Sequence, residues 1–221
     1  MSGAGAVAIF ASAFVLTHLA LSHPLREPLA RRLGPRGFSA AYSAVSLATF
    51  VPMVLARRNA GPEAPLWVLG EWAWIVAALL MWLGSVLFVG SFRRNPAMLQ
   101  VGAGRVRIGE PAGVFRITRH PMMWGFALWA VAHLLVHSEP SAAIIALAIL
   151  VLAIAGSLGQ DRKKQRQLGE AWITWERRTS FVPFGRGLHW PGTFAVIGGT
   201  LLFLLATWLH PYPVGVWRWL L

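Results

Sequence analysis

The chain has 221 residues, of which 56% are hydrophobic and 13% are charged, and its formal net charge is +12. Such an apolar content lies outside the usual range of soluble domains and predicts a protein that crosses a membrane several times. The sequence contains no cysteine. This excludes disulfides, iron–sulfur clusters and thiolate zinc sites, and it leaves histidine as the only soft nitrogen ligand.

Six apolar segments approach the roughly 20 residues that a membrane-spanning helix needs. The first has no Lys or Arg before its apolar run, unlike a secretory signal, so we expect it to be retained as a span. Because there is no internal repeat or linker, we predict one domain over residues 1–221, an all-α polytopic membrane helical bundle. The spans are expected at about 4–23, 38–56, 66–90, 122–137, 141–158 and 192–210.

The basic residues are distributed unevenly between the loops. Seventeen of the 20 Lys and Arg residues follow the first, third and fifth spans, and the other side has Arg57, Arg58 and Arg218. Because short cationic loops remain in the cytoplasm, we predict a bacterial inner-membrane protein with both termini in the periplasm. No nucleic-acid-binding motif accompanies the charge, so the expected partner is the lipid bilayer and not nucleic acid.

The fourth span begins with Arg119, His120 and Pro121. Proline is favoured at the first position of a helix, where unpaired backbone N–H groups and the positive end of the helix dipole attract anions. Together with Arg116, this start predicts an anion site at the inner membrane face. The alternative is an ordinary cationic membrane anchor that begins with proline.

A cytoplasmic amphipathic helix is predicted in residues 160–184, with basic residues on one side and Trp172 and Trp175 on the other. It is expected to lie on the inner leaflet or to cover the mouth of a cavity for a lipophilic small molecule. A surface anchor without a ligand is the alternative.

His18 and His133 are the two histidines that fall inside predicted spans. An ionisable side chain is costly there and suggests a function. Two neutral imidazoles from different helices suit the two axial positions of a haem iron. A hydrogen-bonded packing role is the alternative. On ideal helices the two residues differ in depth by about 6–10 Å, a mismatch that helix tilt must absorb.

Three segments together resemble the NnrU family of bacterial membrane proteins: THLALSHPLREPLARRLG, FRITRHPMMWGFALWAVAHLL and LGEAWITWERRTSFVPF. They are also similar to plant and cyanobacterial 15-cis-zeta-carotene isomerases. The resemblance implies haem b with axial ligands at His18 and His133. We expect Arg119 and Arg116, with His120 beside them, to bind the anionic haem propionates at the inner face. The function implied by the resemblance is isomerisation of a cis double bond, or a redox or sensing role linked to denitrification. Ala130 stands where the isomerase has a cysteine, so thiolate ligation is excluded here.

A more distant resemblance connects the RHP start and the LGE-x-W-x-x-W pattern to membrane isoprenylcysteine and phospholipid methyltransferases. It implies S-adenosylmethionine near Arg119, His120, Glu170 and Trp175, and methylation of a lipophilic substrate. The sequence departs from that pattern at Met123 and at residues 160–161. A third hypothesis is a non-catalytic accessory protein of a respiratory enzyme.

Overall fold

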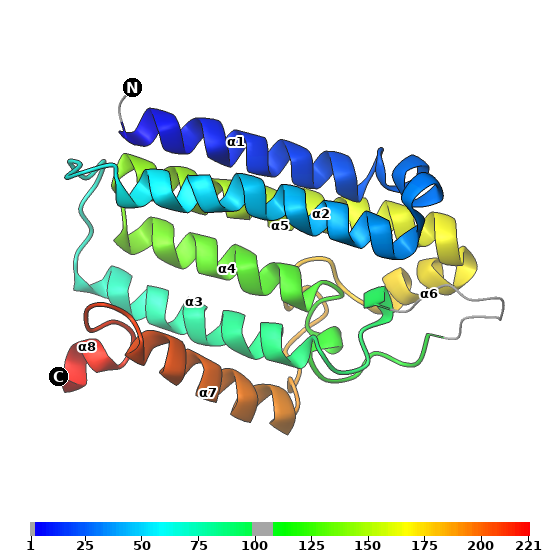
Figure 1. The fold of residues 1–221 in the computed structure, drawn as a ribbon. Coiled ribbons are helices and arrows are strands. Elements are labelled where there is room, and N and C mark those ends of the chain that lie inside the picture. Colours follow the sequence, from blue (N-terminus) through cyan, green and yellow to red (C-terminus); the bar gives the residue numbers. More distant parts are fainter. Residues whose placement is uncertain (1–2, 99–107) are drawn as a thin grey trace.

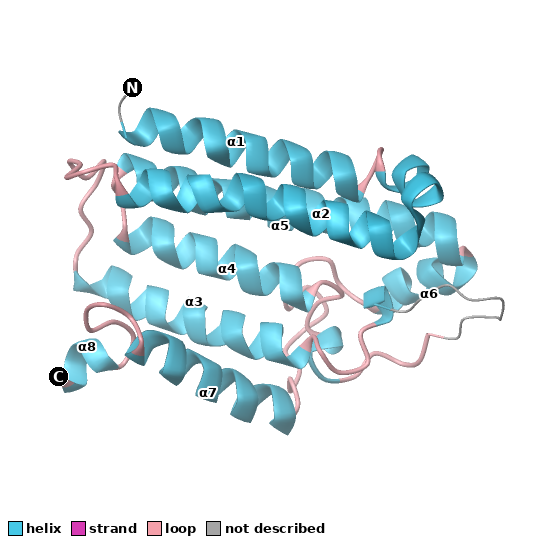
Figure 2. Ribbon diagram, in the orientation of Figure 1, coloured by secondary structure: helices cyan, strands magenta, loops and turns pink. Residues whose placement is uncertain are grey.

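The computed structural model describes residues 3–98 and 108–221, and this part of the chain is helical without strands (Figure 2). Long helices lie side by side, and the two termini lie at the same end of the bundle (Figure 1). Two short 3-10 turns, η1 (Pro96–Met98) and η2 (Gly113–Arg116), lie between the third and fourth helices. The α-helices are α1 (Gly3–Ser22), α2 (Arg26–Arg58), α3 (Glu71–Gly90), α4 (Pro121–Val136), α5 (Pro140–Leu168), α6 (Glu170–Arg178), α7 (Thr193–Trp208) and α8 (Trp217–Leu220).

The prediction of a polytopic helical membrane bundle is confirmed. Helices α1, α2, α3 and α5 are long and apolar enough to cross a membrane, whereas α4 and α7 have 16 residues each. Large apolar side chains remain exposed on the outer faces, for example Leu47 on α2, Leu79 on α3 and Leu201 on α7. Lipid tails are the solvent that such faces require.

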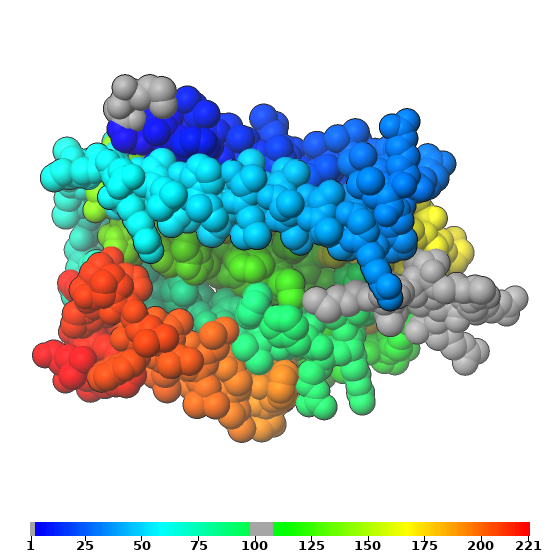
Figure 3. Space-filling model, viewed as in Figure 1, coloured from blue at the N-terminus to red at the C-terminus, as the bar shows by residue number. Residues whose placement is uncertain are grey.

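Helix packing follows a simple order. Helix α3 packs against α4 and α7, α5 packs against α4 and α1, and α2 packs against α1. Glycines allow the closest approaches: a Cβ on Gly125 of α4 would lie 2.9 Å from the carbonyl oxygen of Gly84 in α3. On the face shown in Figure 3, α2 crosses the front of the molecule.

Helix α2 includes a kink where the predicted second span begins. Gly34 has φ 69° and ψ 168°, and Pro35 follows it. Glycine adopts this positive φ without a Cβ clash, and proline is well suited to start the next helical turn. The segment before the kink therefore lies at the bundle end, and the predicted span at 38–56 lies beyond it.

We define the cationic end as the end where α1, α3 and α5 finish and where α4 begins. Most of the predicted cationic loop residues lie there; Arg105 and Arg107 lie outside the described residues. The amphipathic helix of this end is shorter than predicted. Helix α5 continues to Leu168, Gly169 breaks it with φ 53°, and α6 ends at Arg178.

The tryptophans of α6 are in the protein core and not on a membrane surface. Trp172 and Trp175 are 0% and 4% exposed and pack with Val86, Leu87 and Phe115. Tertiary packing decided this, because an amphipathic pattern alone does not distinguish a lipid surface from a protein surface.

Candidate functional site

The start of α4 is fixed by backbone contacts with the loop after α6. The Thr118 hydroxyl donates to the Phe181 carbonyl at 2.7 Å, and the backbone N–H of Arg119 donates to the Ser180 carbonyl at 2.8 Å. The His120 N–H in turn donates to the Thr118 hydroxyl. Pro121 then occupies the first position of α4, as predicted.

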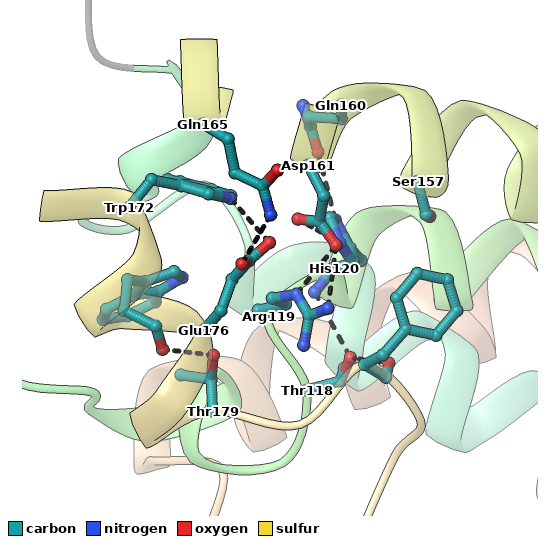
Figure 4. Close-up of polar contacts among 12 residues, drawn as sticks. Thr118, Arg119, His120, Ser157, Gln160, Asp161, Gln165, Trp172, Glu176 and Thr179 are labelled. Atoms are coloured by element: carbon teal, nitrogen blue, oxygen red, sulfur yellow. Dashed lines mark hydrogen bonds and ion pairs between the residues drawn. The ribbon is translucent and has the colours of Figure 1, made fainter. Parts of the chain in front are cut away.

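Four side chains from this start and from α5 form what we call the α4–α5 polar node: Arg119, His120, Gln160 and Asp161 (Figure 4). The Arg119 guanidinium contacts one oxygen of Asp161 through Nη2 at 2.8 Å and donates to it from Nε at 2.9 Å. His120 Nε2 lies 3.0 Å from the other Asp161 oxygen, and His120 Nδ1 lies 3.1 Å from Gln160 Oε1.

The node is shielded from solvent. The side chains of His120, Asp161 and Arg119 are 0%, 9% and 14% exposed. The helix start that sequence analysis predicted as an anion site therefore lies against an anion of its own chain, the Asp161 carboxylate. Arg116 is exposed at the end of η2 and lies outside the node.

Glu176 makes a second connection between α5 and α6 next to the node. It accepts hydrogen bonds from Gln165 at 2.8 Å and from the Trp172 indole at 3.2 Å. The Arg119 guanidinium also lies 5.3 Å from the centre of the Phe181 ring. These contacts join α4, α5, α6 and the following loop into one structure.

The cavity beside Arg119 and His120 has a volume of about 50 Å³. Sites for drug-sized ligands usually span about 300–1,000 Å³, so this cavity does not fit S-adenosylmethionine. The other two residues implied by the methyltransferase resemblance are also apart from it: Glu170 is exposed, and Trp175 is buried in the core.

His18 lies on α1 between aromatic rings. Its ring centroid is 4.4 Å from that of Phe14 and 5.1 Å from that of Tyr42 on α2. Its Nδ1 is buried and has no hydrogen-bond partner within residues 3–98 and 108–221. An imidazole nitrogen in such a position is available to a ligand.

His133 lies near the opposite end of α4. Its Nδ1 is 2.8 Å from the carbonyl oxygen of Trp129, and the two rings stack at 3.9 Å. Because a carbonyl only accepts hydrogen bonds, Nδ1 carries the proton and Nε2 keeps a free lone pair. Metal-binding histidines commonly show this arrangement, in which the second nitrogen donates to a backbone carbonyl.

Within residues 3–98 and 108–221, no hydrogen bond or ring contact joins His18 and His133. Helix α1 packs mainly against α2 and α5, whereas α4 packs against α3 and α5. Measured from the cationic end along ideal helices, His18 lies about 6 Å deep and His133 about 18 Å deep. Each imidazole has the chemistry of an iron ligand, and on ideal helices the two differ in depth by about 12 Å.

Comparison with known proteins identifies the family of the chain. The model of the family described as "NnrU protein" matches residues 7–218. The chain belongs to the NnrU family. No solved structure gives a significant match.

Two curated relatives of this NnrU chain are chloroplastic 15-cis-zeta-carotene isomerases. The Arabidopsis thaliana protein is 29% identical over 178 residues, which cover 77% of this chain and 47% of that protein. The Zea mays protein is 27% identical over 182 residues, with the same coverage of both chains. The NnrU chain thus spans about half the length of the curated relatives it matches.

The ion pair of Asp161 in the NnrU chain was not predicted from the sequence, in which residues 160–161 stand out only as a departure from the methyltransferase pattern. Asp161 is the only aspartate in the sequence and stands in a strongly basic segment, QDRKKQR. That isolation is a usable signal, because a single acid among cations suggests a specific ion pair. Its partners Arg119 and His120 are about 40 residues away along the chain, and only the packing of α4 on α5 reveals them.

Proposed function

We propose that this NnrU-family chain is a membrane-embedded haem b protein that acts on a lipophilic alkene, with His133 as an axial ligand. The observation that supports it most is the state of His133. The Trp129 carbonyl holds Nδ1–H, so the Nε2 lone pair is available inside an apolar helix. Such a hydrogen bond orients an imidazole and raises its basicity toward a metal.

The same geometry argues against a haem whose two axial positions are both filled by histidine. His18 lies at a different depth on a helix that packs elsewhere, so we propose that His133 ligates alone. When bound, a haem with one open axial position binds substrates or small gases, whereas a haem with two ligands favours electron transfer. A role in isomerisation or sensing is therefore proposed over electron transfer.

The names of the curated relatives support an alkene substrate. Both are isomerases of 15-cis-zeta-carotene, a lipophilic polyene, and a membrane bundle is a suitable place to receive one. Since the sequence has no cysteine, a thiolate takes no part in ligation. For the nitrogen-oxide link, we propose nitric oxide as a ligand of the open position.

The cationic residues at the start of α4 are not assigned to the haem propionates. Arg119 and His120 are engaged by Asp161 and Gln160. His133 lies about 18 Å along α4 from that start. Arg116 is exposed at the same end. It is therefore also too far from His133 to bind the propionates of a haem held there.

A visible absorption spectrum of the purified full chain, produced with added haem, tests the assignment. We expect a Soret band with the features of a five-coordinate haem, lost in His133→Ala and retained in His18→Ala. His137→Ala is the matched control, because His137 is one turn further on and bonds to the Tyr212 hydroxyl. An unchanged spectrum in His133→Ala contradicts the proposal, and so does a six-coordinate spectrum that depends on His18.

Activity is tested separately on the haem-containing protein. Incubation with 15-cis-zeta-carotene in micelles, followed by chromatography of the isomers, should show conversion that His133→Ala abolishes. Titration with nitric oxide should shift the Soret band. A Soret band without either response would leave a haem protein with another role and contradict the proposed substrate and ligand.

We also propose that the cationic end faces the cytoplasm. The chain has no cysteine, so single cysteines can report the side on which each loop lies. Asn59→Cys, at the end of α2 opposite the cationic end, should react with a membrane-impermeant maleimide added to intact spheroplasts. Arg36→Cys should react only after lysis, and the reverse pattern would overturn this orientation.

A further inference from the structure

A large groove lies at the cationic end between α1 and α5 and is separate from both His133 and the α4–α5 polar node. Its volume is about 1270 Å³. One part of its wall is apolar and comes from the spanning parts of the two helices, with Leu16, Leu19, Ala155 and Leu158. Leu16 is 67% exposed and Leu158 is 47% exposed, so this part opens toward the lipid.

The other part of the groove is cationic. Arg26, Arg31, Arg162, Lys163 and Arg166 line it, together with one acid, Glu27. Glu27 pairs with Arg31 at 3.9 Å, and both are strongly exposed. Within residues 3–98 and 108–221, Arg162, Lys163 and Arg166 form no ion pair. The groove therefore has unneutralised positive charge beside an apolar wall.

His23 forms the junction between the two parts. Its ring lies against Gly159, where an added Cβ would come within 2.1 Å of the imidazole. Its Nε2 is buried and has no hydrogen-bond partner within the described residues. Burial, together with the charges of Lys163, Arg166 and Arg162, lowers the pKa of His23. The position of its unpartnered Nε2 beside the cationic wall suits a polar headgroup atom.

We propose that this groove binds one phospholipid with an anionic headgroup, from the leaflet at the cationic end. An acyl chain would lie along the apolar wall, and the phosphate would lie among Arg162, Lys163 and Arg166. Clusters of Lys and Arg next to a membrane span attract anionic lipids. The apolar wall distinguishes this groove from a simple phosphate site, because free phosphate would contact the cationic half alone.

Native mass spectrometry of the full chain in mild detergent tests the proposal. The protein is equilibrated with equimolar dioleoyl phosphatidylglycerol and dioleoyl phosphatidylcholine, and the retained lipids are counted. We expect phosphatidylglycerol to be retained preferentially. The double variant Arg162→Gln/Arg166→Gln should lower that preference at least about tenfold, given the strength of attraction per cationic residue near a membrane surface.

The matched control is Arg32→Gln/Arg36→Gln, which removes the same charge at the same end but outside the groove. It should retain the preference of the parent chain. Equal losses in the two double variants would mean that the total charge of this end attracts the lipid, and would overturn the proposal. Equal retention of the two lipids by the parent chain would overturn it as well.

A second variant separates a lipid from free phosphate. Ala155→Phe narrows the apolar wall without changing charge and should reduce lipid retention, while excess inorganic phosphate should compete weakly with the parent chain. Retention unaffected by Ala155→Phe, or abolished by phosphate, would identify a phosphate site instead. The His133→Ala protein should retain the lipid normally, so that failure of the haem proposal leaves this one testable.

Discussion

Each end of α4 has a histidine, but the two lie in different environments: His120 is buried and His133 is partly buried. At the start, His120 Nδ1 lies 3.1 Å from Gln160 Oε1, and Nε2 faces the Asp161 carboxylate at 3.0 Å without the geometry of a hydrogen bond. At the far end, His133 Nδ1 bonds to the Trp129 carbonyl, and Nε2 has no hydrogen-bond partner within residues 3–98 and 108–221. A histidine enclosed by an ion pair and an amide of the neighbouring helix suits a structural role, whereas one with an unused lone pair is available for chemistry. The RHP motif is thus conspicuous in sequence, yet His133 is the better candidate for function.

The largest effect should come from removing the anion of the α4–α5 polar node. Asp161→Ala leaves the buried Arg119 and His120 without their carboxylate, and breaking a buried pair in this way costs about 3–5 kcal/mol. Reversible unfolding in mixed micelles measures the change. Glu27→Ala removes an exposed partner of Arg31 and should change stability by less than about 1 kcal/mol. Equal effects of the two substitutions would contradict a structural role of the node.

Substituting the histidine at each end of α4 in turn tests this comparison directly. His120→Ala should lower the free energy of unfolding by about 2–3 kcal/mol, because it removes the buried ring that faces the Asp161 carboxylate and contacts Gln160 Oε1. It should leave the Soret band of the remaining folded protein intact. His133→Ala should do the opposite, with a smaller loss of stability and no Soret band. A haem spectrum that depends on His120 would break the distinction.

The middle of α4 can be perturbed without touching either end. A Cβ at Gly125 would meet the Gly84 carbonyl and the Phe88 side chain of α3. Gly125→Ala should therefore force α3 and α4 apart and cost about 1–3 kcal/mol. Gly156→Ala on α5, where a Cβ would meet nothing within 4 Å, should be neutral or stabilise by up to about 1 kcal/mol. Unfolding curves in micelles compare the two.

The smallest effect concerns the bundle end opposite the cationic end, where Glu63 accepts a hydrogen bond from the backbone N–H of Ser141 at 3.0 Å. The Ser141 hydroxyl, followed by its N–H, holds the pKa of Glu63 below its usual value. Because the pKa of Glu63 is lower in the folded state, the stabilisation from these hydrogen bonds is present above the pKa of the unfolded state. It is lost as the pH falls through the pKa of the folded state. We expect at most about 1 kcal/mol after solvent screening. Glu63→Gln should remove this part of the pH dependence of unfolding between pH 6 and 3.

The helices themselves were largely predictable from sequence. Apolar segments matched the positions of α1, α4 and α7 and the start of α5 closely, because a spanning helix must present apolar side chains to lipid; α5 itself continues past the predicted end at 158 to Leu168. The third helix begins at Glu71, later than the apolar run at 66 indicated. Residues 66–70 are apolar but are not helical, and Leu66 N–H bonds to the Ser138 carbonyl. A hydropathy profile indicates which segments suit a lipid environment. It does not indicate that an apolar segment forms a loop that contacts another part of the protein.

The candidate site was predictable only in part. Sequence analysis identified Arg119 and His120 as a cationic helix start and His133 as a costly intramembrane side chain, and both observations agree with where these residues lie. The ion pair of Asp161 with Arg119 was not predicted, and the pairing of His18 with His133 stays a prediction. Both depend on which helices are neighbours, and one chain's hydropathy does not contain that information.

The sequence by itself determined the class of the protein: a helical membrane bundle with strongly asymmetric charge, no cysteine and the NnrU pattern. Hydrophobic length and the energetic cost of intramembrane charge are local properties of the chain, so they can be read without a structure. The tertiary structure decided which polar groups have partners. Asp161 neutralises the start of α4, the tryptophans of α6 are buried in the core, and His133 retains a free nitrogen, because hydrogen bonding across helices depends on packing between residues far apart in sequence.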